Sequence, residues 1–205
     1  MEAVFAVVIL IFSVVFHEVS HGLMAHSLGD DTAKDAGRLT LNPIPHLDLV
    51  GSILLPGFFI LLKQFTGTGI VFGWAKPVPI NPYNFRDQKY GAAKVAMIGP
   101  VANLFLAVVF GLALRFVPAV VNSPLATLFS YIVYINIVLA VFNLVPIPPL
   151  DGHHVLFTFL RSESTKRFLY QNGFLLLLFI MFFFFNWISL VAQWIFALIT
   201  GMAAF

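Results

Sequence analysis

The chain has 205 residues, of which 60% are hydrophobic and only 10% are charged. Soluble domains carry roughly 25% charged residues, so this composition predicts an integral membrane protein. The net charge of +2 gives no indication of nucleic-acid binding. The absence of cysteine excludes disulfides, a thiol nucleophile and a thiolate metal site, so any metal must be bound by imidazole and carboxylate groups.

The first predicted helix runs from Met1 to about Leu28 and contains the motif His17-Glu18-Val19-Ser20-His21. No charged residue occurs from Ala3 to Phe16, so the motif lies in an apolar segment. On a helix the two histidines face one side, a turn apart, where both can bind one metal ion with Glu18 beside it as a general base. An acidic residue at membrane depth costs at least about 2.5 kcal/mol, which indicates a function. The alternative is a polar patch that joins helices.

The stretch from Ala36 to about Ile80 has a different composition. Short β-prone, proline-rich and glycine-rich segments flank the uncharged run from Leu49 to Leu62. Because proline is tolerated in edge strands and turns and not in helix interiors, we expect short strands around a short second helix. We expect an extended substrate peptide to bind at the edge of these strands by strand addition.

Further helices are predicted for Gln88 to Phe116, Pro124 to Val145 and His153 to Leu160, the last two separated by a proline-rich break. A basic cluster follows and predicts a cytoplasmic loop; it consists of Arg161, Lys166 and Arg167. The uncharged stretch from Phe174 to Phe205 would be about 48 Å long as one helix, against about 30 Å of hydrocarbon. Asn186-Trp187 near its middle favours a helical hairpin, and one long tilted helix is the alternative.

These elements predict an α-helical polytopic membrane protein. We expect about six transmembrane or membrane-embedded helices, with a small β-rich region between the first and third. A catalytic zinc site usually has three protein ligands and a water molecule, so the two motif histidines need a third partner. The candidates are His26, His46, Asp48, Asp151, His153 and His154.

Asp151 is the strongest candidate for the third ligand. It follows a long uncharged run and lies in a proline-broken helix, where irregular backbone lets a side chain point into a cavity. Capping of the next short helix is the alternative role for this residue. His26 faces the opposite side of its helix from His17, and His46 and Asp48 lie in the connector, where a surface turn is the simpler explanation.

Two motifs together resemble the paired signature of the site-2 protease family of intramembrane zinc metalloproteases, peptidase family M50. They are His17 to Gly22 and Asn143 to Gly152. The segments Gly73 to Phe85 and Gly99 to Asn103 also resemble that family, in the same order. The resemblance covers residues from about 10 to 160. It indicates a minimal form without the PDZ or CBS domain of some members.

The resemblance implies a single membrane-embedded metalloprotease domain over residues 1–205, with a catalytic core at 1–160 and C-terminal helices at 161–205. It implies one Zn²⁺ per chain, held by His17, His21 and Asp151, with Glu18 as the catalytic base. It also places Asn143 near the active site, where its amide would contact the oxyanion or the substrate backbone. A helix–helix hydrogen bond is the alternative role for that amide. His153 and His154 are not expected to be ligands.

The implied reaction is hydrolysis of peptide bonds within or near transmembrane segments, as in regulated intramembrane proteolysis. The expected partners are single-pass or other membrane proteins and the lipid bilayer, and the expected location is a prokaryotic cell membrane. A metal-ion transporter is one alternative, but it predicts staggered polar sites along a path, whereas this chain concentrates its acidic and imidazole groups in two motifs. A non-catalytic membrane chaperone is another, and it would typically lack Glu18 or a ligand.

Overall fold

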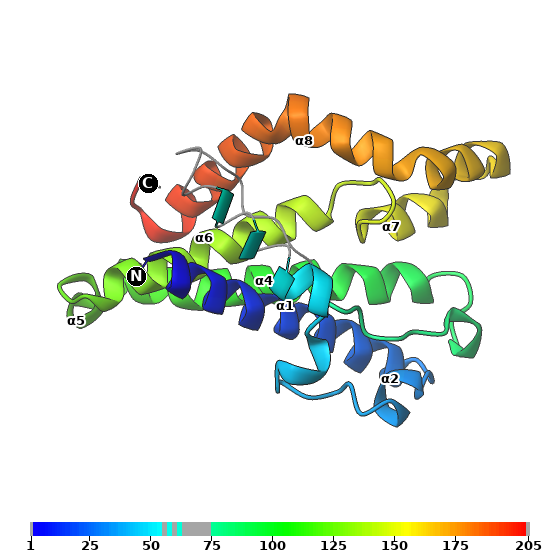
Figure 1. The fold of residues 1–205 in the computed structure, drawn as a ribbon, viewed down its shortest axis with the longest axis horizontal. Coiled ribbons are helices and arrows are strands. Elements are labelled where there is room, and N and C mark those ends of the chain that lie inside the picture. The colour runs from blue at the N-terminus through cyan, green and yellow to red at the C-terminus, as the bar shows by residue number, and fades with distance from the viewer. Residues whose placement is uncertain (1, 55–56, 59–60, 63–74, 204–205) are drawn as a thin grey trace.

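The computed structural model describes residues 2–54, 57–58, 61–62 and 75–203 (Figure 1). Within these residues, four apolar helical segments are long enough to cross a membrane. They are Val4–Ser27, Gly91–Phe116, Leu125–Asn143 and Glu163–Phe184, and a shorter apolar segment, Asn186–Thr200, follows. The polytopic helical class predicted from the sequence therefore fits, and the protein is an integral membrane protein.

Three long helices form the centre of the molecule: α1 (Glu2–Ser27), α4 (Gly91–Phe116) and α6 (Leu125–Asn143). They pack against one another, while α8 (Glu163–Thr200) packs on α6 and α4 (Figure 1). Two short helices, α5 (Pro118–Val121) and α7 (Gly152–Phe159), flank α6. The observed ends of α1, α4, α6 and α7 lie within a few residues of the predicted ones.

The main hydrophobic core joins α4, α6 and α8 away from the motif. It consists of Ala107, Leu114, Val133, Ile137, Ala192 and Phe196. The close approach of α4 and α8 depends on Gly111, because a Cβ at this position would lie 2.4 Å from Ile199 Cγ2. Helices in a membrane commonly meet through such small residues.

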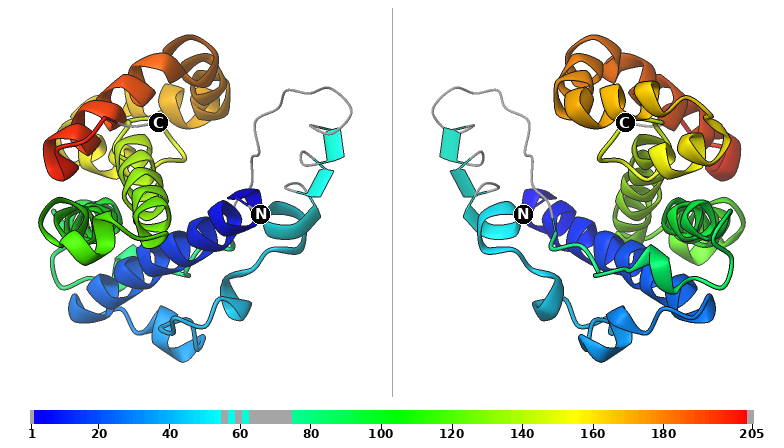
Figure 2. Two further views of the ribbon diagram at one scale, coloured as in Figure 1. Left: turned by 90° about the vertical axis from the view of Figure 1, so that its left-hand side faces the viewer. Right: turned by 90° about the vertical axis from the view of Figure 1, so that its right-hand side faces the viewer.

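The predicted β-rich region between the first and third helices is wrong. The described residues of that stretch contain no strand; they form the short helix α2 (Thr32–Asp35), the turns η1 (Ile44–His46) and η3 (Pro82–Asn84), the π-helical segment η2 (Leu49–Leu54) and irregular chain. Both views of Figure 2 show η1 and η2 well separated from α8. The glycine-rich run at 67–73 lies outside the described residues.

Backbone hydrogen bonding explains the absence of a sheet in the described part of that stretch. Prolines lack the N–H that a ladder requires. Two backbone amides between these prolines donate to side chains: Val78 N–H donates to the Glu18 carboxylate and Asn81 N–H to the Asp30 carboxylate. Lys76 N–H donates to the His46 carbonyl. Separate hydrogen bonds to α1, to the loop that follows α1 and to η1 therefore hold this segment in place of a sheet.

The helix α8 is continuous over 38 residues, so the hairpin expected at Asn186-Trp187 does not form and the alternative of one long helix holds. Ser162 caps its N-terminus and accepts a hydrogen bond from Thr165 N–H, and Gly201 caps its C-terminus with a φ of +74°. At 1.5 Å per residue the helix is about 57 Å long, more than the hydrocarbon thickness. Figure 1 shows that it curves along its length.

The turn between α6 and α7 is packed tightly from two sides. A Cβ at Gly152 would lie 2.3 Å from the Leu144 carbonyl oxygen, and a Cβ at Gly173 of α8 would lie 2.5 Å from the Pro148 carbonyl oxygen. The end of α6 and the first half of α8 therefore enclose this turn. Asp151, its last residue, is held in a fixed place relative to α1 and α4.

Candidate active site

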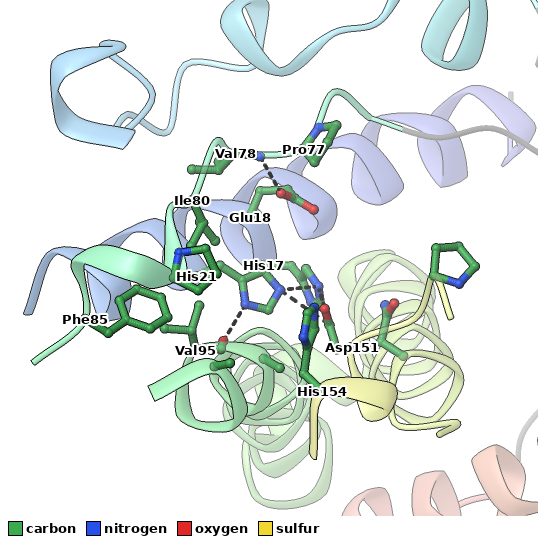
Figure 3. A pocket seen from close by; sticks show the side chains of 15 residues that line it. His17, Glu18, His21, Pro77, Val78, Ile80, Phe85, Val95, Asp151 and His154 are labelled. Carbon is green, nitrogen blue, oxygen red and sulfur yellow. Dashed lines mark hydrogen bonds and ion pairs between the residues drawn. The ribbon is translucent and has the colours of Figure 1, made fainter. Parts of the chain in front are cut away.

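The two motif histidines lie on the side of α1 that faces α4, and both are almost fully buried, His17 with 5% and His21 with 6% of its surface exposed. Their Nε2 atoms are 3.0 Å apart. Asp151 Oδ2 approaches them from the start of α7, at 3.1 Å from His17 Nε2 and 3.3 Å from His21 Nε2 (Figure 3). The structure thus brings together the three residues that the resemblance named as ligands.

Hydrogen bonds on the far side of each ring fix the chemistry of these nitrogens. His21 Nδ1 lies 2.6 Å from the Val95 carbonyl oxygen. A carbonyl can only accept, so His21 Nδ1 carries the hydrogen and Nε2 presents a lone pair. His17 Nδ1–H likewise donates to Asn103 Oδ1 at 2.6 Å. With one hydrogen on each ring, at Nδ1, both imidazoles direct Nε2 lone pairs toward Asp151.

The converging atoms fit a bound cation. All three ligand atoms lie within 4.8 Å of one another. Asp151 Oδ2 is buried and, among the described residues, receives no hydrogen bond of regular geometry. Two lone pairs and a carboxylate oxygen at such short distances repel one another unless a metal ion or a proton lies among them. Imidazole nitrogen and carboxylate oxygen are ligands that zinc accepts in tetrahedral sites.

One face of α4 supports both imidazoles. Val95, Gly99 and Asn103 are four residues apart and so lie on one side of the helix, against α1. A Cβ at Gly99 would lie 2.5 Å from His21 Nε2 and 2.6 Å from His17 Cε1. Only glycine allows the α4 backbone to pass this close to the rings.

Glu18 lies beside the ligands and is not among them. Its Oε2 accepts a hydrogen bond of 2.9 Å from Val78 N–H, in the irregular segment that crosses over α1 (Figure 3). The side chain is half-buried and lines the same cavity as the three ligand atoms. This is the relation to a metal site that the motif predicts for a general base.

The three converging side chains line a cavity of about 320 Å³. Its wall combines Glu18 and the three ligand side chains with Asn143, His154 and a mostly apolar set: Pro77, Val78, Ile80, Pro82, Phe85, Ala92, Val95, Ala96 and Pro149. Asn143 is half-buried, and its Nδ2 donates to the Leu139 carbonyl of its own helix at 3.0 Å. Asn143 thus lies in the cavity wall, and its contact with substrate or oxyanion stays a prediction.

The other third-ligand candidates have structural contacts elsewhere. His26 pairs with Asp31 at the end of α1. His46 is fully buried and its Nε2 bonds to the Thr40 carbonyl; burial lowers the pKa of its imidazole. Asp48 Oδ1 accepts hydrogen bonds from two amides at the start of η2. His26, His46 and Asp48 do not appear in the cavity wall formed by the described residues.

The adjacent histidines of α7 differ from each other. His153 is buried, with Nδ1–H donating to the Leu150 carbonyl and Nε2 3.4 Å from the Tyr170 hydroxyl. His154 lines the cavity and stacks on His153, with ring centroids 3.9 Å apart. Neither belongs to the group of three converging ligand atoms.

Asp30 is a buried carboxylate whose role the sequence did not indicate. It accepts hydrogen bonds from Asn81 N–H at 2.7 Å, from Asn84 Nδ2 at 2.8 Å and from the amide and hydroxyl of Thr32. Burial acts to raise the pKa of Asp30, but these hydrogen bonds outweigh it and hold the pKa below the usual value. The contacts fix η3 to the end of α1 and so position the segment that reaches Glu18.

Two buried amides were also missed as functional candidates: Asn103 of α4 and Asn136 of α6 are both fully buried. Asn103 occurs in a segment that resembles the family, but no role was assigned to it. Both amides interrupt uncharged stretches of helix at membrane depth, where a polar side chain needs a partner. That placement was the signal that could have found them.

Comparison with known proteins places the chain in a family. Residues 117–185, which include Asp151, match the model of peptidase family M50. The chain is 39% identical over 162 residues to YwhC of Bacillus subtilis (strain 168), which is named as an inferred zinc metalloprotease; the match covers 74% of the chain and 67% of that protein. The chain belongs to peptidase family M50.

Other relatives of this M50 peptidase are named in the same way as inferred zinc metalloproteases. Rip2 of Mycobacterium tuberculosis (strain ATCC 25618 / H37Rv) is 29% identical over 190 residues, covering 91% of the chain and 70% of that protein. MJ0611 of Methanocaldococcus jannaschii is 39% identical over 92 residues, covering 42% of the chain and 46% of that protein. No solved structure is significantly similar to the chain.

The family confirms the resemblance found in the sequence. It also confirms the predicted class of enzyme, a membrane-embedded metalloprotease and hence a hydrolase. No observation in the described part of the molecule favours the transporter or chaperone alternatives.

Proposed function

We propose that His17, His21 and Asp151 hold the zinc ion of this M50 peptidase and that Glu18 is its general base. The observation that carries the proposal is the convergence of two lone-pair nitrogens and one carboxylate oxygen at 3.0 to 3.3 Å, with both Nδ1 hydrogens donated elsewhere. The enzyme is a zinc metalloprotease, in agreement with the family and with the metal in its relatives' names. Three protein ligands leave the fourth position of a tetrahedral site for water.

When bound, zinc supplies a lowered pKa for its water and polarisation of the scissile carbonyl. Glu18 shares the cavity with the ligands, so its carboxylate takes the proton of the attacking water and passes it to the leaving amine. Val78 N–H, bonded to Oε2, fixes the direction of that carboxylate.

The substrates we propose are single-pass or other membrane proteins, cleaved within or near their transmembrane segments in a prokaryotic cell membrane. The bacterial and archaeal relatives support this location. A transmembrane helix has its carbonyls hydrogen-bonded, so it must unwind before it reaches the cavity. Asn143, in the cavity wall, is placed to donate to the unwound backbone or to the oxyanion once its amide leaves the Leu139 carbonyl. The catalytic core is proposed at 1–160.

Glu18→Gln tests the assignment of the base. The amide oxygen of glutamine still accepts from Val78 N–H, so the variant keeps its fold and its zinc. Cleavage of a verified membrane-protein substrate should fall by about 10²- to 10⁴-fold, the usual contribution of a general base. Normal turnover by this variant contradicts the assignment. The same variant can trap bound membrane proteins for identification.

Zinc content tests the ligands. His17→Ala, His21→Ala and Asp151→Ala should each lose stoichiometric zinc, and a chelator should abolish cleavage by the wild-type enzyme. His26→Ala is the matched control, because His26 is on the same helix but pairs with Asp31 outside the cavity. Full zinc content in any of the three ligand variants refutes its role.

A further inference from the structure

A buried chain of amide hydrogen bonds runs from His17 away from the cavity. Asn103 of α4 and Asn136 of α6 are fully buried, and Ser13 of α1 is 4% exposed. Neither asparagine appears in the wall of the catalytic cavity. Asn136 therefore does not touch the reacting groups, and the hydrogen-bonded path from it to His17 runs through Asn103.

The direction of every hydrogen bond in this chain follows from two backbone carbonyls. Asn136 Nδ2 lies 2.8 Å from the Ile132 carbonyl oxygen and 2.9 Å from Ser13 Oγ. Since the carbonyl can only accept, the amide nitrogen of Asn136 must face it. The Oδ1 of Asn136 consequently faces Asn103 as an acceptor.

Asn103 is oriented by the same reasoning. Its Nδ2 donates to Asn136 Oδ1 at 2.7 Å and to the Ser13 carbonyl oxygen at 3.2 Å, so both of its hydrogens are used. A flipped amide would place its oxygen against these two acceptors in a buried site, where such contacts are unfavourable. Asn103 Oδ1 must therefore face His17 Nδ1, which is 2.6 Å away and has to carry the hydrogen.

This orientation opposes a competing arrangement in the metal-free protein. The Asp151 carboxylate oxygen is 3.1 Å from His17 Nε2, close enough to accept a hydrogen bond from an Nε2–H tautomer. That bond would occupy a metal-binding nitrogen and a metal-binding oxygen at once. An acceptor held against Nδ1 favours the other tautomer and keeps the Nε2 lone pair available.

We propose that Asn136 is a positioning residue that sets the tautomer of His17 through Asn103, and so keeps the site ready for zinc. The inference rests on the proposed function in that His17 is taken as a ligand. His21 needs no such device, because the Val95 carbonyl sets its tautomer directly. His17 depends on a side-chain amide, and without Asn136 only the longer hydrogen bond of 3.2 Å to the Ser13 carbonyl would hold that amide in its orientation.

The first test is the tautomer of His17 in zinc-free wild-type protein in detergent, read from its ring ¹⁵N chemical shifts. The His17 signals are assigned by their loss in His17→Gln. The expected result is Nδ1–H with an unprotonated Nε2. An Nε2–H tautomer overturns the proposal, whatever any variant does.

The second test is Asn136→Leu, which is similar in size but has no amide. Zinc affinity, measured by competition with a chelator, should fall about 10- to 100-fold, and the zinc-free His17 signals should shift toward Nε2–H. Ser13→Ala is the matched control, because it removes the hydroxyl but leaves both orienting carbonyls in place. It should keep the wild-type tautomer and zinc affinity.

The outcomes separate the proposal from a structural role and from the proposed function. If Asn136→Leu and Ser13→Ala lower thermal stability alike with unchanged zinc affinity, Asn136 only packs the helices and the proposal is overturned. If His17→Ala binds zinc like the wild type, the ligand assignment fails. The tautomer of zinc-free His17 is then still measurable, so the two failures are distinguishable.

Discussion

Gly99→Ala is the sharpest test of how closely α4 must approach the two rings that we propose as zinc ligands. The added Cβ would lie 2.5 Å from His21 Cε1 and Nε2 and 2.6 Å from His17 Cε1, whereas ordinary contacts are 3.4 to 4 Å. Both rings lie between α1 and α4, so neither can withdraw without losing the hydrogen bond from its Nδ1. The substitution therefore acts on both proposed ligands at once.

The size of the effect follows from this crowding. Restoring a normal contact requires a movement of roughly 1 Å, whereas a metal site tolerates deviations of about 0.2 Å in its ligand distances. A misplacement of about 1 Å at a reacting centre costs on the order of 100-fold in rate. Overpacking a buried site typically costs about 1 to 3 kcal/mol in folding free energy. Gly99→Ala should therefore fold, with zinc affinity reduced at least about 10-fold and cleavage about 100-fold.

Gly111→Ala provides the matched control on the same helix. Its Cβ would lie 2.4 Å from Ile199 Cγ2, so the overpacking is similar but lies in the interface with α8. Both variants should lose comparable thermal stability, and only Gly99→Ala should lose zinc affinity and cleavage of a verified membrane-protein substrate. If the two variants retain the same zinc affinity, the close approach of α4 to the rings does not govern the site.

Three further predictions concern other parts of the chain. Val78→Pro removes the N–H that donates to Glu18, at a position between two prolines that already favour extended chain. This variant should keep its zinc but lose about 10- to 100-fold in kcat. Val78→Ala keeps the N–H and should retain most activity, so equal losses in the two variants would refute the role of the amide. The pKa of Asp30 is depressed below 3.8 in the folded state, so its contribution is complete above that pH and lost as pH falls through the lower folded value. Asp30→Asn should therefore lower the thermal midpoint at pH 7, and its deficit should shrink below about pH 4; a deficit independent of pH would refute this. Because the chain has no cysteine, spin labels can be attached specifically to a variant that carries Glu163→Cys and Leu198→Cys. A continuous α8 predicts roughly 50 Å between the two labels, whereas a hairpin predicts a much shorter distance.

The sequence predicted the features that depend on local periodicity. A helical repeat is enough to place His17 and His21 on one side of α1, and long uncharged runs are enough to place the spanning helices. Asp151 was identified from its position after such a run and from the family resemblance. Its distance of 3.1 Å from His17 Nε2 depends on how α6 and α8 enclose the turn that precedes α7, which no local pattern contains.

The prediction of a β-rich region is wrong because strand propensity does not show which groups accept hydrogen bonds from the backbone amides. In the described residues, Glu18 and Asp30 accept from Val78 N–H and Asn81 N–H, so side chains of α1 and its following loop replace a partner strand. The hairpin failed for a related reason. Neither asparagine nor tryptophan removes a backbone donor as proline does, so Asn186-Trp187 does not end a helix whose neighbours on both sides are apolar.

The two proposed histidine ligands show why part of the site could not be predicted. His21 is oriented by the Val95 carbonyl, a backbone group that no substitution at that position removes, so Val95→Ala should preserve its tautomer. His17 is oriented by Asn103, whose amide has two possible orientations that differ in which group faces the ring. The orientation of the Asn103 amide is set by the Ile132 and Ser13 carbonyls, which belong to different helices. These carbonyls act on His17 only through the hydrogen-bonded amides of Asn136 and Asn103. Mutations should therefore affect the tautomers of the two histidines unequally. The tautomer of His17 depends on residues in three helices, whereas that of His21 depends on the backbone of one helix.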